Sequence, residues 1–247
     1  MNKQSISASL PLAYVVYAVF FVSEHIWAVL IGALLTLLLE LWLWRGISSN
    51  ASSLKEKLNL LLPYFLILVA AFGLVASINL TVEEIKTLKD TNHIASCSVS
   101  PIVSCTSSIG SDQGQVLGPP NPLLGTAAFG ALLSVAFGAL AGAKYKKWFW
   151  QVMWAAGVLG LLSVVWFISQ ALYELNALCI YCMMTWTVVI PTFVYLTLYA
   201  HLQKHIKLPK QIASLFEKYH LTLLISMYAV VILLIYFRFD YYWNSLF

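Results

Sequence analysis

The chain has 247 residues, of which 61% are hydrophobic and 10% are charged, whereas about 25% of residues are charged in an average soluble domain. This composition, with a mean hydropathy of +0.83, excludes an ordinary soluble protein and indicates a chain that crosses a membrane several times. The net charge of +4 is small and the basic residues gather in a few loops, which is typical of orientation in a membrane and not of nucleic-acid binding.

The N-terminal region contains one or two membrane segments. Glu24 and His25 interrupt its apolar stretch, and an acidic residue at mid-membrane costs about 2.5 to 3.5 kcal/mol on insertion scales, so we place this pair at a turn. A short segment over 8–22, which crosses the membrane or lies partly in its interface, then precedes a full span over 26–44. No small-x-small cleavage site follows the first segment, so we expect it to be retained and not removed as a signal peptide.

Five further spans are predicted over 58–80, 121–143, 148–170, 177–199 and 219–237. Residues 81–90 are expected to extend the first of these as a solvated helix end, on which Glu83 or Glu84 can meet Lys86 or Lys89. Lysines and arginines cluster in three loops, at 45–57, 144–147 and 201–218. The positive-inside rule places all three loops in the cytoplasm.

This topology gathers the four cysteines of the chain on one face of the membrane. Cys97 and Cys105 fall in an exterior polar loop over 91–120, and Cys179 and Cys182 fall at the exterior end of a span. The exterior is also the side on which disulfides persist.

The spacing of the second pair favours redox chemistry. Cysteines three apart on a helix have Cβ atoms about 5 to 6 Å apart, but a relaxed disulfide needs about 3.5 to 4.5 Å, so a bond between Cys179 and Cys182 should be strained and easily reduced. If Cys179 lies in the first helical turn, free backbone N–H groups and the helix dipole stabilise its thiolate. The loop pair can then approach a second protein and pass electrons inward by thiol–disulfide exchange.

Two other readings of the cysteines are weaker. Two structural disulfides in a membrane transporter or scaffold are one alternative, although closing a three-residue spacing stabilises a fold little. A zinc site is not expected, because these spacings are unusual for ligands and apolar surroundings supply no second shell. A redox relay that ends in a bilayer needs a lipid-soluble acceptor of two electrons, for which a quinone is the natural candidate.

Four sequence features resemble the vitamin K epoxide reductase family, in its bacterial branch. They are CSVSPIVSC at 97–105, Ser111, GPPNPLLG at 118–125 and ALCIYC before MMTW, in one order over about residues 60–200. The resemblance implies an all-α integral membrane protein with a four-helix bundle around a quinone, plus one C-terminal and one or two N-terminal membrane helices. It divides the chain into an N-terminal hydrophobic hairpin with a basic linker (1–57), the catalytic bundle (58–200) and a cytoplasmic linker with a final helix (201–247).

The resemblance also implies a role for each cysteine. Cys97 exchanges with the partner protein, Cys105 passes electrons to Cys179, and Cys182 faces the quinone ring. Ser98 follows the first cysteine where an acidic residue is common in the family, which leaves open any electrostatic control of that cysteine.

Three further residues take expected roles around the quinone. Asn121 matches a position that hydrogen-bonds a quinone carbonyl, and Ser111 matches a loop position that helps to hold the active conformation. Asn121 before Pro122 also fits a helix N-cap, which would explain it without a ligand. Trp186 stands where the animal enzymes have a tyrosine that contacts vitamin K, and its single indole N–H leaves such a contact open.

The expected function is that of a thiol:quinone oxidoreductase in the cytoplasmic membrane. The resemblance implies that it reoxidises a separate DsbA-like thioredoxin-fold protein and passes the electrons to menaquinone or ubiquinone, so that exported proteins gain disulfides. A reductase of vitamin K epoxide or of a quinone, with the thiols as its source of electrons, is the alternative within enzymes. The scaffold with structural disulfides is the alternative outside them.

Overall fold

The computed structural model describes residues 3–90 and 92–244, so the ends of the two predicted terminal regions (1–2 and 245–247) and Thr91 of the predicted loop lie outside the description. The described residues form helices and loops without a β-strand. Seven helical segments are long and apolar enough to cross a membrane. They are α1 (Lys3–Val16) continued by the π-helical turn η1 (Tyr17–Phe21), α2 (Ile26–Ile47), α3 (Leu54–Lys89), α4 (Asn121–Leu140), α5 (Lys147–Tyr173), α6 (Ile180–Leu202) and α7 (Lys210–Arg238).

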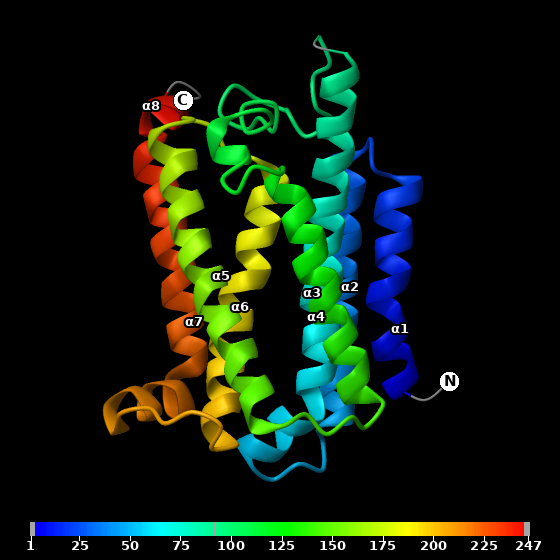
Figure 1. Cartoon of the computed structure of the whole chain (residues 1–247), viewed down its shortest axis with the longest axis vertical. Helices are drawn as coiled ribbons and strands as arrows, with labels where there is room; N and C mark the ends of the chain where they lie inside the picture. Colours follow the sequence, from blue (N-terminus) through cyan, green and yellow to red (C-terminus); the bar gives the residue numbers. More distant parts are fainter. Residues whose placement is uncertain (1–2, 91, 245–247) are drawn as a thin grey trace.

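This arrangement confirms the predicted all-α membrane fold and decides between one and two N-terminal helices. The first segment begins at Lys3 and reaches Phe21, so it is long enough to cross, and the turn at Glu24 and His25 separates it from α2. The last helix begins earlier than predicted, at Lys210, and bends at Tyr219, whose φ of −120° and ψ of 23° are not helical. The basic segment before Tyr219 is therefore helical and lies across the end of the bundle (Figure 1).

Helices α3 and α6 form the centre of the bundle. Helix α4 packs on α3, α5 packs on α6, and α7 lies outside α6 (Figure 1). The contact of α3 with α4 depends on Gly73, because a Cβ atom there would lie 2.4 Å from the ring of Phe129. Leu66 and Ile67 of α3 and Val188 of α6 are buried in the same core cluster as Phe129. The four helices α3 to α6 therefore make the predicted bundle.

The N-terminal hairpin of α1 and α2 packs on the outer side of α3 and is held by polar groups within the bundle. The Tyr14 hydroxyl donates to the Val29 carbonyl at 3.1 Å and joins the two helices of the hairpin. Asn79 of α3 donates through Nδ2 to the Ala18 carbonyl at 3.5 Å, in the π-helical turn. Buried hydrogen bonds of this kind fix neighbouring helices against each other. The hairpin is thus an integral wall of the bundle.

The two ends of the bundle differ in charge and chemistry. The loops 48–53, 141–146 and 203–209, with the basic residues that flank them, lie at the end that also holds the start of α1 (Figure 1). The segment 92–120, with Cys97 and Cys105, lies at the opposite end, as do the turn before α6 and the short helix α8 (Asp240–Asn244) (Figure 1). Both cysteine pairs therefore share the end that is far from the basic loops.

Candidate functional site

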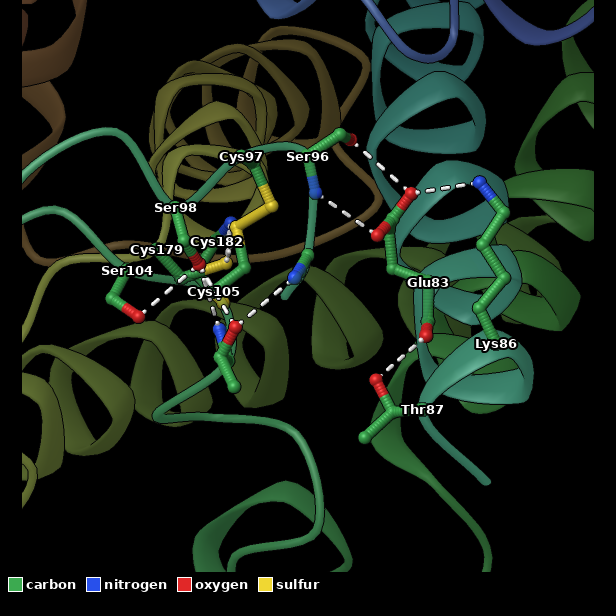
Figure 2. The surroundings of a disulfide bond; sticks show 12 residues. Glu83, Lys86, Thr87, Ser96, Cys97, Ser98, Ser104, Cys105, Cys179 and Cys182 are labelled. Carbon is green, nitrogen blue, oxygen red and sulfur yellow. Dashed lines mark hydrogen bonds and ion pairs between the residues drawn. A yellow bond between two sulfur atoms is a disulfide. The ribbon is translucent and has the colours of Figure 1, made fainter. Parts of the chain in front are cut away.

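The four sulfur atoms form one cluster at this end of the bundle (Figure 2). Cys97 and Cys105 are joined by a disulfide, with their Cα atoms 5.7 Å apart, whereas Cys179 and Cys182 are free thiols. The Sγ atoms of Cys105 and Cys179 lie 3.2 Å apart although the two residues are 74 positions apart in the chain. At this distance a thiolate can attack a disulfide sulfur.

Backbone pairing brings the two cysteine segments together. The Leu178 N–H donates to the Ile102 carbonyl at 2.8 Å, and the Ser104 N–H donates to the Leu178 carbonyl at 2.9 Å. These bonds form a short parallel bridge between Val103 and Leu178. Since Leu178 directly precedes Cys179 and Ser104 directly precedes Cys105, the bridge sets the register that places one sulfur beside the other.

Cys179 is the N-cap of α6, as expected for a residue at the start of the helix. Its Sγ accepts a hydrogen bond from the Cys182 N–H at 3.4 Å. Burial alone would raise the pKa of the Cys179 thiol, but hydrogen bonds from the Cys182 thiol and from the N–H groups of Cys182 and Tyr181 outweigh it, so its pKa lies below the ordinary value. The lowered pKa favours the thiolate form that such an exchange requires.

Glu83 anchors the segment that carries Cys97 (Figure 2). Its carboxylate accepts hydrogen bonds from the Ser96 N–H at 3.0 Å, from the Ser96 hydroxyl at 3.2 Å and from Lys86 at 3.2 Å, and it contacts His93 Nε2 at 2.9 Å. Lys86 also pairs with Glu24, in the turn of the N-terminal hairpin. The N-terminal hairpin, α3 and the redox loop thus meet in one charged network.

The predicted helical extension over 81–90 is confirmed, since α3 reaches Lys89 and its last residues are exposed, and so is the pairing of Glu83 with Lys86. The predicted solvation is wrong for the two glutamates. Glu83 is 2% exposed and Glu84 is 6% exposed, because the loop after α3 folds back over the end of the helix. No local pattern in the sequence marks this burial, since the partners of Glu83 come from ten and thirteen residues further along the chain.

A cavity of about 680 Å³ lies among α3, α4, α5, α6 and the segment 108–117. Its walls are mostly apolar, with side chains such as Leu80, Phe129 and Val189, and they carry a few polar groups. Five of the predicted site residues line it: Ser111, Asn121, Cys179, Cys182 and Trp186. A flat ring with apolar substituents and two carbonyl groups fits a cavity of this volume and lining, which is typical of small-molecule sites.

Comparison with known families decides the class of the protein. A model of the vitamin K epoxide reductase family matches residues 64–197, which is more than half of the chain and includes the four cysteines and the cavity-lining helices. The chain belongs to the vitamin K epoxide reductase family. Members of this family are membrane thiol oxidoreductases that reduce quinones. A search among curated proteins found no match.

In this family member, Asn121 and Ser111 hold the loop over the cavity. The Ser111 hydroxyl donates to the Ser108 carbonyl at 2.9 Å and accepts from the Gly114 N–H at 3.1 Å, which caps the short 3-10 helix η2 (Asp112–Gly114). Asn121 donates through Nδ2 to the Gln113 carbonyl at 2.6 Å. Its Oδ1 accepts from the Val116 N–H at 3.2 Å.

The alternative role of Asn121 as the N-cap of α4 is wrong. Pro120 is the N-cap residue, and no side chain makes a capping hydrogen bond at this helix. The Asn121 amide instead joins the loop to α4 at the edge of the cavity, because its contacts with the Gln113 and Val116 backbone use both of its polar atoms. Trp186 packs with Ile168 and Ile190 and presents its remaining surface to the cavity.

A residue outside the family match holds the turn before Cys179. Arg238, at the end of α7, donates through Nε to the Leu172 carbonyl at 2.8 Å, and it also contacts Asn176 Oδ1. Its guanidinium lies 5.8 Å from the centre of the Tyr173 ring. Asn176 has a φ of 51°, in the left-handed region, so this turn needs such support. No motif in the sequence connects Arg238 with the cysteines.

Replacing Arg238 with lysine is expected to loosen this turn, because an ammonium group cannot reproduce the forked hydrogen bonds of a guanidinium. A hydrogen bond to a charged group typically contributes about 1.5 kcal/mol. Its loss raises the fraction of molecules in which the turn is open roughly tenfold. Alkylation of the free thiols of the Cys179 pair should accelerate by a similar factor, measured by mass spectrometry. Arg45→Lys, at the opposite end of the bundle, is the matched control, and equal rates in the two variants would contradict the assigned role.

Proposed function

We propose that the chain is a disulfide-forming thiol:quinone oxidoreductase of the DsbB-like bacterial branch, which reoxidises a separate thioredoxin-fold protein. The observation that supports this most directly is the contact of 3.2 Å between Cys105 Sγ, in a disulfide, and Cys179 Sγ, in a free dithiol. The loop disulfide belongs to the segment 92–120 at the end of the bundle, and Cys182 lines an apolar cavity.

In the proposed relay, a thiolate of the partner attacks Cys97 and breaks its bond to Cys105. The released Cys105 thiolate attacks Cys179 of an oxidised Cys179–Cys182 pair, and Cys182 leaves as a thiolate. The second thiolate of the partner then attacks the partner sulfur of the mixed disulfide and releases Cys97. The Cys97 thiolate attacks Cys105, which restores the loop disulfide and releases Cys179 as a thiolate. The partner thereby loses two electrons and gains a disulfide, and the membrane pair gains those electrons. The oxidised loop and reduced membrane pair of the structure correspond to the state that follows this transfer.

The cavity residues fit the acceptor end of the relay. Asn121 and Trp186 would hold the ring, and Cys182 lies on the same wall as Trp186. A bound quinone, menaquinone or ubiquinone, supplies the capacity to accept two electrons. Residues 58–200, with the loop 91–120, then form the catalytic unit, which is consistent with the family match over 64–197.

The orientation follows from charge. The three basic loops lie at the end opposite the cysteines, which under the positive-inside rule supports a cysteine end outside the cytoplasm (Figure 1). That side is the one where thiol proteins acquire disulfides. The two free thiols of Cys179 and Cys182 speak against a scaffold with two structural disulfides.

The test is the redox state of exported thiol proteins in cells that depend on this chain. Cys97→Ala should leave these proteins reduced, because the partner then has no sulfur to attack. Cys105→Ala should instead trap the partner on Cys97 as a mixed disulfide, which non-reducing electrophoresis and mass spectrometry would identify. Equal amounts of each variant in the membrane are the control. Exported proteins that stay oxidised with both variants would refute the proposal.

A further inference from the structure

Two consecutive acidic residues of α3 face different parts of the site. Glu83 turns to the cysteine loop, whereas Glu84 lines the cavity, on the helix face that also presents Ser77 and Leu80. Glu84 is 6% exposed. Within residues 3–90 and 92–244 its carboxyl group makes neither a hydrogen bond nor an ion pair, so a buried ionisable group stands in the cavity without a partner.

The surroundings of Glu84 contain little charge. It is the only acidic or basic residue among the described residues that line the cavity, and the nearby Lys86 is directed to Glu83 and Glu24. The groups that share the cavity and can lose a proton all come from the start of α6: Cys179, Tyr181 and Cys182. Helices α4 and α5 and the loop contribute polar groups that are neutral, among them Asn121, Gln170, Ser108, Ser111 and Gln113.

An unpaired carboxylate in such a place is unstable. Burial of a charged group without a partner costs several kcal/mol, and a carboxyl group avoids this cost by keeping its proton. Burial therefore favours the neutral form of Glu84, which can donate a proton within the cavity. The redox chemistry of the site needs such a group, because oxidation of a dithiol releases two protons together with two electrons.

We propose that Glu84 is the proton-exchanging residue of this cavity, an inference that rests on the proposed function. Glu84 donates one proton to a carbonyl oxygen of the bound quinone as Cys182 passes on the electron pair, and it regains a proton from one thiol of the cysteine pair. It then repeats the transfer, with the proton of the other thiol, to the second carbonyl oxygen. Two S–H bonds break and one S–S bond forms between Cys179 and Cys182. Two electrons and two protons reach the quinone, and Glu84 ends in the state in which it began.

The first test detects the proton itself in protein that is purified without quinone. Infrared spectra at neutral pH should contain the carbonyl band of a neutral carboxylic acid that disappears in Glu84→Gln. Glu174→Gln is the matched control, because it removes the same charge from an exposed residue at the same end of the bundle, and it should keep the band. A spectrum in which Glu84→Gln loses no such band would overturn the inference, whatever the protein does with quinones.

The second test measures catalysis with a short-chain ubiquinone and dithiothreitol. Positioned acid–base groups contribute about 10²- to 10⁴-fold, so kcat of Glu84→Gln should fall by at least roughly a hundredfold with little change in KM. Formation of the Cys105–Cys179 disulfide should stay unchanged. Normal kcat in Glu84→Gln would overturn the inference and leave the proposed function intact, whereas an unmodified protein that reduces no quinone would refute the proposed function alone.

Discussion

Cys182→Ser is expected to abolish quinone reduction and to trap a disulfide between Cys105 and Cys179. The serine hydroxyl cannot carry the electrons to the cavity, and Cys179 then has no neighbouring thiol to release it from Cys105. The contact of 3.2 Å between these two sulfurs means that the bond can form without a rearrangement of the bundle. Peptide mapping under non-reducing conditions should find the pair linked in most of the protein, and turnover should fall to the background rate.

The same experiment has an internal control. With oxidised glutathione added as the oxidant, Cys182→Ser combined with Cys97→Ser should raise the yield of the Cys105–Cys179 disulfide further, because Cys97 can no longer compete for Cys105. Turnover that survives in Cys182→Ser, or a linkage of Cys179 to Cys97 in place of Cys105, would contradict the order of the relay.

Glu83→Ala is expected to have the second large effect, on the loop and not on the cavity. The substitution leaves the Ser96 N–H, the Ser96 hydroxyl and Lys86 without their acceptor, and hydrogen bonds to a buried charge are typically worth about 1.5 to 3 kcal/mol. The free energy of unfolding should fall by about 2 to 3 kcal/mol in denaturant titrations. Hydrogen exchange should show that residues 93–98 lose protection first, because their anchor to α3 is gone.

Two variants separate this anchor from a general effect of charge. Glu83→Gln keeps an acceptor oxygen and should recover part of the stability, whereas Asp90→Ala, at the exposed end of α3, should cost little. If Asp90→Ala destabilises the protein as much as Glu83→Ala, the buried network around Ser96 is not what holds the loop.

The sequence predicted the cysteine cluster well because its information is local. Each signal that was used is a pattern within a few tens of residues: the spacing of Cys179 and Cys182, the basic loops and the apolar runs. The family motifs add a role for each cysteine. The 3-10 turn at Ser111 and the cavity position of Trp186 agree with the motif positions, although the quinone contacts stay a prediction.

The parts that were missed depend on contacts between distant segments. Glu83 looked like a solvated residue because its burial is produced by His93 and Ser96 in a loop that folds back. Helix α7 starts at Lys210, earlier than predicted. The lysines of this segment indicate the cytoplasmic side of the membrane, but lysine is also a good helix former. The local Asn-Pro pattern suggests the alternative N-cap role of Asn121. The hydrogen-bond partners of Asn121 are instead Gln113 and Val116, which belong to the preceding loop.

The bridge between Val103 and Leu178 has a consequence for the timing of electron flow. Cys97 is completely buried, so a partner protein can reach it only after the loop has moved. The Val99 and Ser100 N–H groups both donate to the Val103 carbonyl, which ties the segment after Cys97 to the residues that pair with Leu178. In the proposed relay, opening of this segment toward a partner is therefore expected to draw Cys105 away from Cys179. The exchange with the partner and the exchange with the membrane pair would then alternate, so that a bound quinone would never meet the thiols of the partner directly.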